Sequence, residues 1–360
     1  MLIYIRVALI LLCCVYITGR ATASPIDEIR NSWAELHKEV QSGTFEWEEE
    51  FTIMKGRADI DTLVKPAKDL SLDYPPSDIT MHRKCSLAVE GTKRAWRTTG
   101  DFWSSGLAKV SAATYVSIFD GEKGISYNEG PEFDGLQWAS YTKEFSDSTE
   151  INLLAIEWSI KGPWKAIQSS DASQWTVREG KLGGKRCQIA QMRAPGITRV
   201  FWCDPQSSHR ILRYDVSEKG IPALEISIEY RDHGKGVKVP SQWSYTLYTA
   251  DGTIDNMLKA RVTSARINEG VAAGSFEIEL PARTVLLDDR DGSVKVVMPD
   301  GDLRVVTDAE MAAGTSFQEI LDGGEPPQGI WRWPVFGLAA IVICVGAWYV
   351  CRRYRARRLN

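Results

Sequence analysis

The residues that could do chemistry are few and scattered along this sequence. The four histidines share no spacing of the kind that zinc ligands have; they are His37, His82, His209 and His233. The sequence also contains no phosphate-binding glycine loop, no G-x-S-x-G elbow and no H-E-x-x-H motif. We therefore predict no catalytic residue, no metal site and no cofactor, and we expect that the protein is not an enzyme.

One acidic run needs a separate explanation. Residues Asp288-Asp289-Arg290-Asp291-Gly292 resemble a calcium loop, but the glutamate that closes such a loop is missing at the required spacing. The dipeptide Asp-Gly is also a strong signal for the tip of a β-hairpin. We interpret the run as a hairpin turn.

Three cysteines lie away from the two ends of the chain, at Cys85, Cys187 and Cys203. Cys187 and Cys203 are equidistant from Pro195, which lies in a predicted hairpin turn. Facing residues on an antiparallel hairpin have Cα atoms about 4.5–5.5 Å apart, which is within the range of a disulfide. Two interpretations stay open: a disulfide between Cys187 and Cys203 in an oxidising compartment, or two buried thiols, since one extra turn residue would break the register.

Aromatic residues on predicted strands form the remaining candidate site. They could simply pack a core under helices, or one curved sheet face could leave a groove for an apolar ligand, because ligand pockets are usually concave and apolar. The sequence does not separate these interpretations. The residues are Phe45, Trp47, Trp96, Tyr115, Phe119, Tyr127, Trp202, Trp243 and Tyr245.

The elements that would position these residues are mostly strands. Apolar and polar residues alternate over 44–53, with Glu49 as the one break, and again over 224–230 and 275–280. Such alternation predicts antiparallel sheet with one packed face. We expect about eleven to thirteen strands between Thr44 and Val306, counted from these runs and their turn signals.

Two helices are expected beside the sheet. The first follows Ser24, which can cap it, and carries an apolar stripe at helical spacing; the stripe is Ile29, Trp33, Leu36 and Val40. The second lies within Glu150 to Ile167. The predicted fold class is therefore mainly β, with a little helix.

Both ends of the chain predict targeting and anchoring. Residues 1–23 combine Arg6, an apolar run and a small-residue cleavage site, which is typical of a signal peptide; an uncleaved N-terminal anchor is the alternative. Residues 323–334 read as a short tether. Residues 335–351 contain no charged side chain and predict a short transmembrane helix.

The arginines beside that helix predict its orientation. Residues 352–360 contain five arginines, against Arg332 alone on the other side. Because positive residues favour the cytoplasmic side, we expect a single-pass protein of the bacterial cell membrane with a cytoplasmic tail. Its main domain would be extracytoplasmic, on the periplasmic side.

The charge of that domain excludes one class of partner. The whole sequence has 43 basic and 47 acidic residues. Without Arg6, Arg20 and the five tail arginines, 36 basic residues remain against 47 acidic ones, a net charge of −11. An acidic domain has no electrostatic footprint for nucleic acid, so we expect no nucleic-acid partner.

Several short motifs resemble a known family in their order along the chain. They are Val40-Gln41-Ser42-Gly43 at the end of the first helix, Tyr115-Val116-Ser117-Ile118-Phe119-Asp120-Gly121, Val239-Pro240-Ser241-Gln242-Trp243, Ala265-Arg266-Ile267-Asn268 and Phe276-Glu277-Ile278-Glu279-Leu280-Pro281. The pattern is similar to the LolA/LolB-like outer-membrane lipoprotein-carrier superfamily, which includes RseB-like sensors, and to its membrane-anchored bacterial members of unknown function.

The resemblance implies a curled antiparallel sheet that forms an unclosed barrel over residues 24–283, with helices over an apolar concave face. Residues 284–322 would be a C-terminal β extension. The family's carriers hold lipoprotein acyl chains without catalysis, but a spanning helix forbids shuttling between membranes.

Two functions follow as expectations. The first is a membrane-anchored, non-catalytic binding module for an apolar ligand, either an acyl chain or a lipoprotein. The alternative is a structural or sensory envelope ectodomain that binds a protein partner, whose identity the sequence does not give. An uncharacterised hydrolase ranks third.

Overall fold

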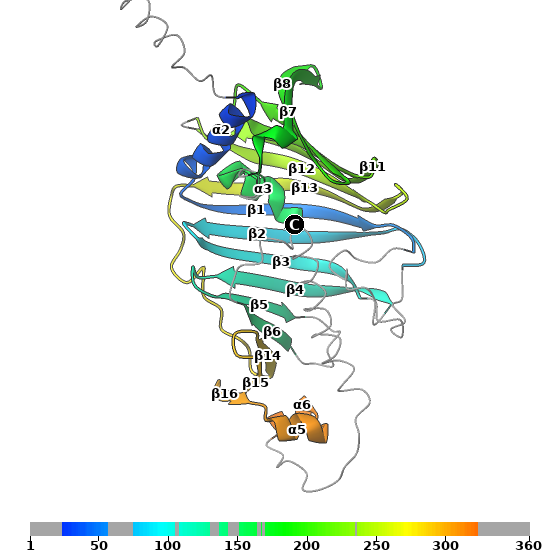
Figure 1. The fold of residues 1–360 in the computed structure, drawn as a ribbon. Coiled ribbons are helices and arrows are strands. Elements are labelled where there is room, and N and C mark those ends of the chain that lie inside the picture. The colour runs from blue at the N-terminus through cyan, green and yellow to red at the C-terminus, as the bar shows by residue number, and fades with distance from the viewer. Residues whose placement is uncertain are drawn as a thin grey trace, which may run out of the picture.

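A computed structural model describes residues 24–56, 75–104, 108–129, 137–142, 151–163, 167, 170–234 and 236–322. More than half of these residues build one curled sheet, shown in Figure 1. The first eight strands are β1 (Ser42–Ile53), β2 (Ile79–Glu90), β3 (Lys93–Ser104), β4 (Lys109–Phe119), β5 (Gly124–Glu129), β6 (Gln137–Thr142), β7 (Trp175–Leu182) and β8 (Lys185–Ala194). The next eight are β9 (Ile197–Asp204), β10 (Arg210–Glu218), β11 (Ile221–Asp232), β12 (Lys238–Tyr248), β13 (Ile254–Ile267), β14 (Thr284–Asp288), β15 (Ser293–Val297) and β16 (Leu303–Val305).

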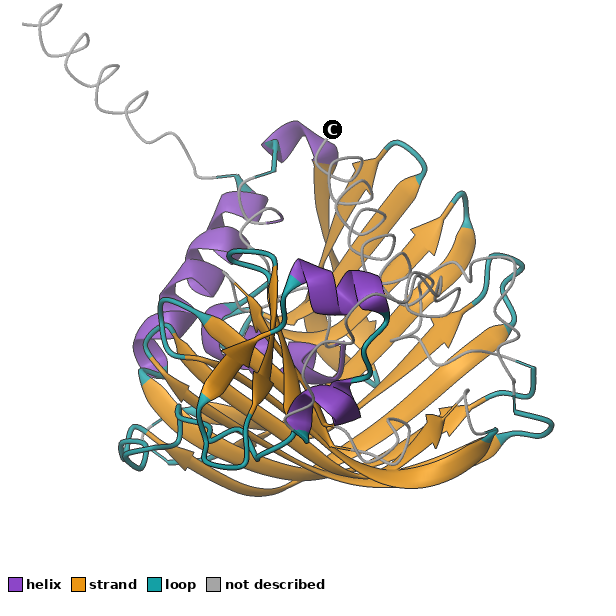
Figure 2. Cartoon of the chain, turned by 90° about the horizontal axis from the view of Figure 1, so that it is seen from below, coloured by secondary structure: helices purple, strands orange, loops and turns teal. Residues whose placement is uncertain are grey.

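The strand order is β16-β15-β14-β6-β5-β4-β3-β2-β1-β13-β12-β11-β10-β9-β8-β7. Every neighbouring pair is antiparallel except β14 with β6. The sheet curls without closing, as Figure 2 shows, and β16 and β7 are its edges. The expected mainly β, unclosed curled sheet is confirmed. The sheet has sixteen strands rather than eleven to thirteen, because short strands such as β5, β6 and β16 carry too few residues to show a clear alternation.

The first expected helix is α2 (Pro25–Glu39), and it is confirmed. The Ser24 side chain accepts a hydrogen bond from the Asp27 backbone N–H, and the Asp27 carboxylate accepts one from the Ser24 backbone in return. This reciprocal cap satisfies two backbone N–H groups that a helix start leaves without partners. The apolar stripe of α2 is fully buried; it consists of Ile29, Trp33, Leu36 and Val40.

The second expected helix is α3 (Ile151–Lys161), and it is confirmed too. A 3-10 turn (Ala172–Gln174) follows it before β7. Figure 1 shows α2 and α3 over one half of the sheet, and their principal contacts are with each other and with β7, β10 and β12. We call the face that carries these helices the inner face and the opposite one the outer face.

The segment 275–280 corrects one prediction. Its alternating residues do not form a strand; the segment belongs to an irregular crossover that leads from β13 to β14. Phe276, Ile278 and Leu280 instead pack on an apolar cluster that includes Val116 and Ile118 of β4. The alternation over 275–280 therefore arises because one side of the segment is buried, although the segment is not a strand of the sheet.

The C-terminal strands continue the same sheet. β14 pairs in parallel with β6, and the β14–β15 hairpin turns at Asp289 to Gly292, where the sequence predicted a hairpin tip. Two short helices follow, α5 (Asp308–Ala313) and α6 (Phe317–Leu321). Ile320 and Leu321 of α6 form a small core with Val296 and Val306.

Among the described residues, no helix is long and apolar enough to cross a membrane. The predicted signal peptide (1–23), tether (323–334), transmembrane helix (335–351) and basic tail (352–360) all lie outside the described residues.

Candidate functional site

The strand register arranges the inner-face side chains in rows across the sheet. Residues directly opposite each other in a ladder point to the same face, and neighbours along a strand alternate. The first row is Phe45, Leu87, Trp96, Ser117, Ser126 and Ser140. The second row is Trp47, Cys85, Thr98, Tyr115, Asn128 and Trp138. The third row is Trp243, Ala260, Glu49, Arg83, Gly100 and Ala113.

The nine predicted site residues divide between the two faces. The register places seven on the inner face: Phe45, Trp47, Trp96, Tyr115, Phe119, Trp243 and Tyr245. Tyr127 pairs with Val116, and Trp202 pairs with Ile189 and Arg213, so both point to the outer face. The prediction that all nine residues line one face is therefore wrong for Tyr127 and Trp202. Alternation within a strand shows which residues share a face, but it does not show whether that face is the inner or the outer one.

The inner face under α2 and α3 is a filled aromatic core. The Trp33 ring of α2 lies 5.4 Å from Phe201, and the Trp158 ring of α3 lies 5.0 Å from Tyr214, edge-on. Trp47 and Trp243 meet at 5.6 Å between centroids. These side chains are almost fully buried, and such tilted ring pairs add about 0.5–1.5 kcal/mol beyond area burial. This half of the inner face is occupied by the chain itself.

A turn between β9 and β10 holds both helices over this core. Arg210 is buried; its guanidinium forms an ion pair with Glu39 at the end of α2 and donates a 2.7 Å hydrogen bond to the Ser159 carbonyl of α3. The preceding residue, His209, has its Nδ1 2.8 Å from Ser32 Oγ, and its carbonyl accepts from Trp33 Nε1 at 2.8 Å. Burial lowers the pKa of His209. His209 thus forms part of the helix attachment.

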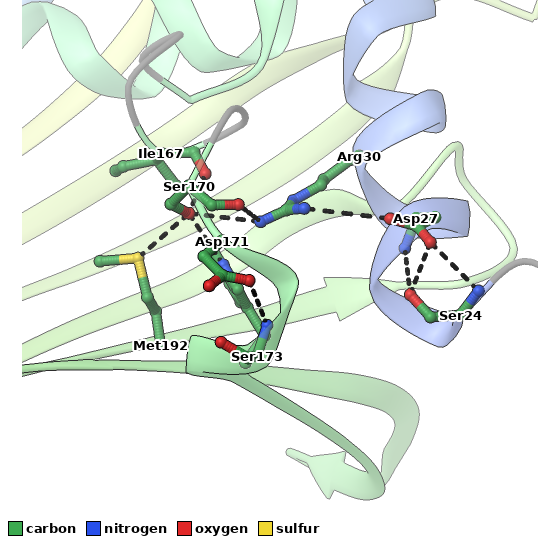
Figure 3. A network of polar contacts seen from close by, with 9 residues as sticks. Ser24, Asp27, Arg30, Ile167, Ser170, Asp171, Ser173 and Met192 are labelled. Carbon is green, nitrogen blue, oxygen red and sulfur yellow. Dashed lines mark hydrogen bonds and ion pairs between the residues drawn. The ribbon is translucent and has the colours of Figure 1, made fainter.

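A second network fixes the start of α2, as Figure 3 shows. Arg30 donates to the carbonyl and the hydroxyl of Ser170 and lies near the carboxylate of Asp27, which caps the helix. The Ser170 hydroxyl donates to the Ile167 carbonyl at 2.7 Å and accepts from the indole of Trp175. The helix therefore cannot leave this half of the sheet without breaking several polar contacts.

Two buried ionisable side chains, Glu49 and Arg83, lie opposite each other in the third row. Glu49 accepts a 2.8 Å hydrogen bond from Trp47 Nε1, and burial raises the pKa of its carboxyl. The Arg83 guanidinium lies between the rings of Phe51 and Phe102, at 4.5 and 4.1 Å. Our interpretation of the sequence did not select Glu49 as a site residue, although it was the one break in the alternation of its strand.

The packing reverses between β3 and β4. On β4 to β6 the apolar cluster lies on the outer face, where the crossover segment covers it; it consists of Val116, Ile118, Ile125, Tyr127, Ala139 and Leu286. The inner face there carries hydroxyls, an amide and half-buried rings instead. These are Ser117, Ser126, Ser140, Asn128, Tyr115, Phe119 and Trp138. The inner face of β4–β6 is thus the part of the concave surface whose composition is not that of a core.

Aromatic rings border this part of the inner face. The Tyr115 ring lies 4.6 Å from Phe102, and Trp138 meets Phe317 of α6 edge-on at 5.8 Å. Trp138 and the serines were missed from the sequence, because serine-rich short strands such as β5 and β6 give a weak alternation signal. We take the inner face of β3–β6 as the candidate binding face.

The structure agrees with the interpretation of Cys187 and Cys203 as two buried thiols. Cys85, Cys187 and Cys203 are buried thiols, and none is in a disulfide in the structure. The β8–β9 turn has two residues, so Cys203 pairs with Gln188 and not with Cys187. The predicted disulfide is therefore corrected: by strand alternation the two side chains point to opposite faces. Desolvation raises the pKa of both thiols, which makes them poor nucleophiles.

The acidic run at 288–292 is an ion-pair cluster. The Asp288 side chain is only 1% exposed and accepts hydrogen bonds from Arg290 and Lys295, both at 2.7 Å. These partners hold the pKa of Asp288 well below its ordinary range. Its carboxylate is thus committed to two cations on the same hairpin. Among the described residues, no group of histidine, cysteine and acidic side chains could hold a metal ion.

Comparisons with known proteins give distant structural similarity and no match in sequence. No protein-family model matches the sequence, and no curated protein matches it. The structure is similar to a DUF1329 family protein from Desulfovibrio piger, with a TM-score of 0.41 and 12% identity over 70% of this chain and 97% of that one. It is also similar to a putative outer membrane lipoprotein-sorting protein domain from Vibrio parahaemolyticus, with a TM-score of 0.36 and 12% identity over 70% and 94% of the two chains.

A third solved structure has the same kind of similarity. It is a LolA superfamily protein from Nitrosomonas europaea, with a TM-score of 0.35 and 9% identity over 69% of this chain and 96% of that one. This third protein bears the name of the superfamily that the sequence resembles. Similarity this low transfers no ligand, partner or activity to this chain.

Proposed function

We propose that this chain is a non-catalytic, membrane-anchored binding module that holds an acyl ligand on the inner face of β3–β6. The observation that carries the proposal is the reversed packing of β4–β6. Tyr115, Phe119 and Trp138 are only half buried there, while the apolar core of the same strands lies on the outer face. Aromatic rings on a concave surface that is not a core are what an apolar ligand would cover.

The energetics favour an acyl chain. Each methylene buried contributes about 0.8 kcal/mol, so a chain that lies along Tyr115, Phe102 and Trp138 would gain enough to bind in spite of the entropy it loses. Phe102 and Tyr115 already form one ring pair on adjacent strands. The extracytoplasmic location and the anchor at residues 335–351 belong to the same proposal and rest on the sequence alone.

The test uses the full chain in lipid nanodiscs and a methyl ester of palmitic acid with a photoreactive group in its chain. We expect covalent labelling of the wild-type chain, and at least fivefold weaker labelling of Tyr115→Ala. Thr114→Ala is the matched control, because Thr114 is the neighbour of Tyr115 on β4 and points to the outer face. Equal labelling of all three proteins, or no labelling of the wild type above a heat-denatured sample, would refute the proposal.

A protein-binding role is the second candidate, and one observation favours it. The edge strand β16 exposes two apolar side chains on the same side, Leu303 at 49% and Val305 at 52%. An exposed apolar edge can pair with a strand of another chain. If Leu303→Lys with Val305→Lys abolishes the crosslinking of the full chain to a membrane partner and leaves acyl labelling intact, the edge is a partner site.

A further inference from the structure

The inner face of β4–β6 carries a row of hydroxyl groups. Ser117, Ser126 and Ser140 occupy directly opposite positions on three adjacent strands. The hydroxyls of Ser117 and Ser126 lie 3.2 Å apart, and all three residues are half buried. Three serines side by side contribute almost no apolar surface to packing, so the row does not serve as a core.

A tryptophan extends the row onto β3. Trp96 lies directly opposite Ser117 and is 7% exposed. Its indole N–H has no hydrogen-bond partner in the part of the chain that the structure describes. The Oδ1 atom of Asn128, in the adjacent row, likewise has no partner there. A buried donor or acceptor without a partner costs about 1–3 kcal/mol, and a polar ligand group that pairs with these two atoms would remove that cost.

The inner face of β4–β6, where the three serines lie, is almost without charge. The inward side chains from Ser111 to Phe119, from Gly124 to Asn128 and from Trp138 to Thr142 are all neutral, although a quarter of the sequence is charged. The charged groups beside this face are Lys109, at the exposed start of β4, and Arg94 of β3, which lies opposite Phe119 and forms an ion pair with Glu157 of α3. A charged ligand group at the three serines would lose water and find no counter-ion among the adjacent inward side chains of β4–β6, which is unfavourable. A group with several neutral donors and acceptors would lose little.

We infer that the row of Trp96, Ser117, Ser126 and Ser140 binds the uncharged, hydroxyl-bearing head group of the acyl ligand, of the kind found in a glycerol ester. Serine hydroxyls both donate and accept hydrogen bonds, the indole donates, and the Asn128 carbonyl accepts. Hydroxyls and an ester carbonyl satisfy all of these groups at once. This inference rests on the proposed function and specifies which acyl ligands the same face prefers.

The experiment compares three competitors against the photoreactive methyl ester on the full chain in nanodiscs. They are 1-monopalmitoylglycerol, methyl palmitate and palmitate, added at equal concentrations. We expect the glycerol ester to compete best, about three- to tenfold better than methyl palmitate for each hydrogen bond gained, and the charged palmitate to compete worst. Equal competition by all three, or best competition by palmitate, would overturn the inference and leave the proposed function standing.

Two variants locate the preference. Ser126→Ala removes the central hydroxyl, and Trp96→Phe removes the indole N–H but keeps a ring. Each should reduce the advantage of the glycerol ester over methyl palmitate by about three- to tenfold. Ser86→Ala is the control, because Ser86 lies on β2 and points to the outer face.

Unchanged preference in both variants would overturn the inference even if the wild type prefers the glycerol ester, since the head group would then bind elsewhere. Absence of labelling by every acyl probe would refute the proposed function and this inference together, which distinguishes the two failures.

Discussion

The two halves of the inner face are built from one sheet but differ in what occupies them. Under α2 and α3 the face is filled by tryptophan, phenylalanine and tyrosine rings, and buried polar contacts at Arg210 and Arg30 hold the helices in place. On β4–β6 the apolar core lies on the opposite side, and the inner face carries serines and half-buried rings. One half of the concave surface thus contributes to the stability of the fold, and the other half is the face on which we propose that the ligand binds.

This difference predicts that replacing a tryptophan by alanine lowers stability much more in the filled half than on β4–β6, and that only the substitution on β4–β6 weakens acyl labelling. Trp33→Ala removes a fully buried ring from the filled half and should lower the free energy of unfolding by about 4 kcal/mol. Trp138→Ala removes a half-buried ring from β6 and should cost about 1 kcal/mol but weaken acyl labelling strongly. Thermal unfolding of the full chain, followed by tryptophan fluorescence, measures the first difference. Equal losses of stability would break the comparison.

Acid should loosen the filled half selectively. The pKa of buried His209 is lowered from its ordinary 6.5, so the unfolded state binds the proton more readily than the folded state. Stability therefore falls as the pH drops below about 6.5 toward the folded-state pKa. Tm values at pH 7.5 and 5.5 should show a loss that His209→Gln abolishes. His82→Gln, at an exposed position of β2, should keep the loss; an unchanged pH dependence in His209→Gln would contradict the role of this histidine.

Glu49 should respond to pH in the opposite direction. Burial raises the pKa of its carboxyl in the folded state, so the folded state holds the proton more tightly than the unfolded one. Its contribution to stability is present below the ordinary pKa of glutamate and is lost as the pH rises through the folded-state value. Glu49→Gln should accordingly stabilise the chain more at pH 8 than at pH 5. A Tm difference between variant and wild type that does not change with pH would contradict this assignment.

Treatment with a reducing agent, which tests the state of the cysteines, should have the smallest effect on stability. Because Cys187 and Cys203 are thiols on opposite faces of the sheet, a reducing agent should leave the Tm unchanged. Alkylation of the unfolded, unreduced chain should modify Cys85, Cys187 and Cys203 alike, as peptide masses will show. A Tm that falls on reduction would instead restore the disulfide, which typically contributes about 2–4 kcal/mol.

Local signals in the sequence were sufficient for some elements and not for others. The cap at Ser24 and the apolar stripe of α2 lie within one helix, so both could be predicted, and the Asp-Gly turn before β15 follows from neighbouring residues alone. The alternation over 275–280 has the same local form as a strand, yet Phe276 packs outside the sheet. Whether an extended segment finds a partner depends on distant strands.

The candidate site needed long-range information for the same reason. The faces that Tyr127 and Trp202 serve depend on the registers of β5 and β9 with their neighbours, including a shift between β9 and β10. The row of Ser117, Ser126 and Ser140 appears only when three strands are aligned. Glu49 was visible as a break in its strand, but its burial was not.

The most direct test of the central claim is to locate the ligand on the chain. A monoacylglycerol with a photoreactive group near its head should be crosslinked to the full chain in nanodiscs, and the labelled residues read by tandem mass spectrometry. We expect labels on inner-face residues of β4–β6, with Tyr115 and Trp138 foremost. Labels on outer-face Tyr127 or on α2 and α3, with none on the inner face of β4–β6, would contradict the account.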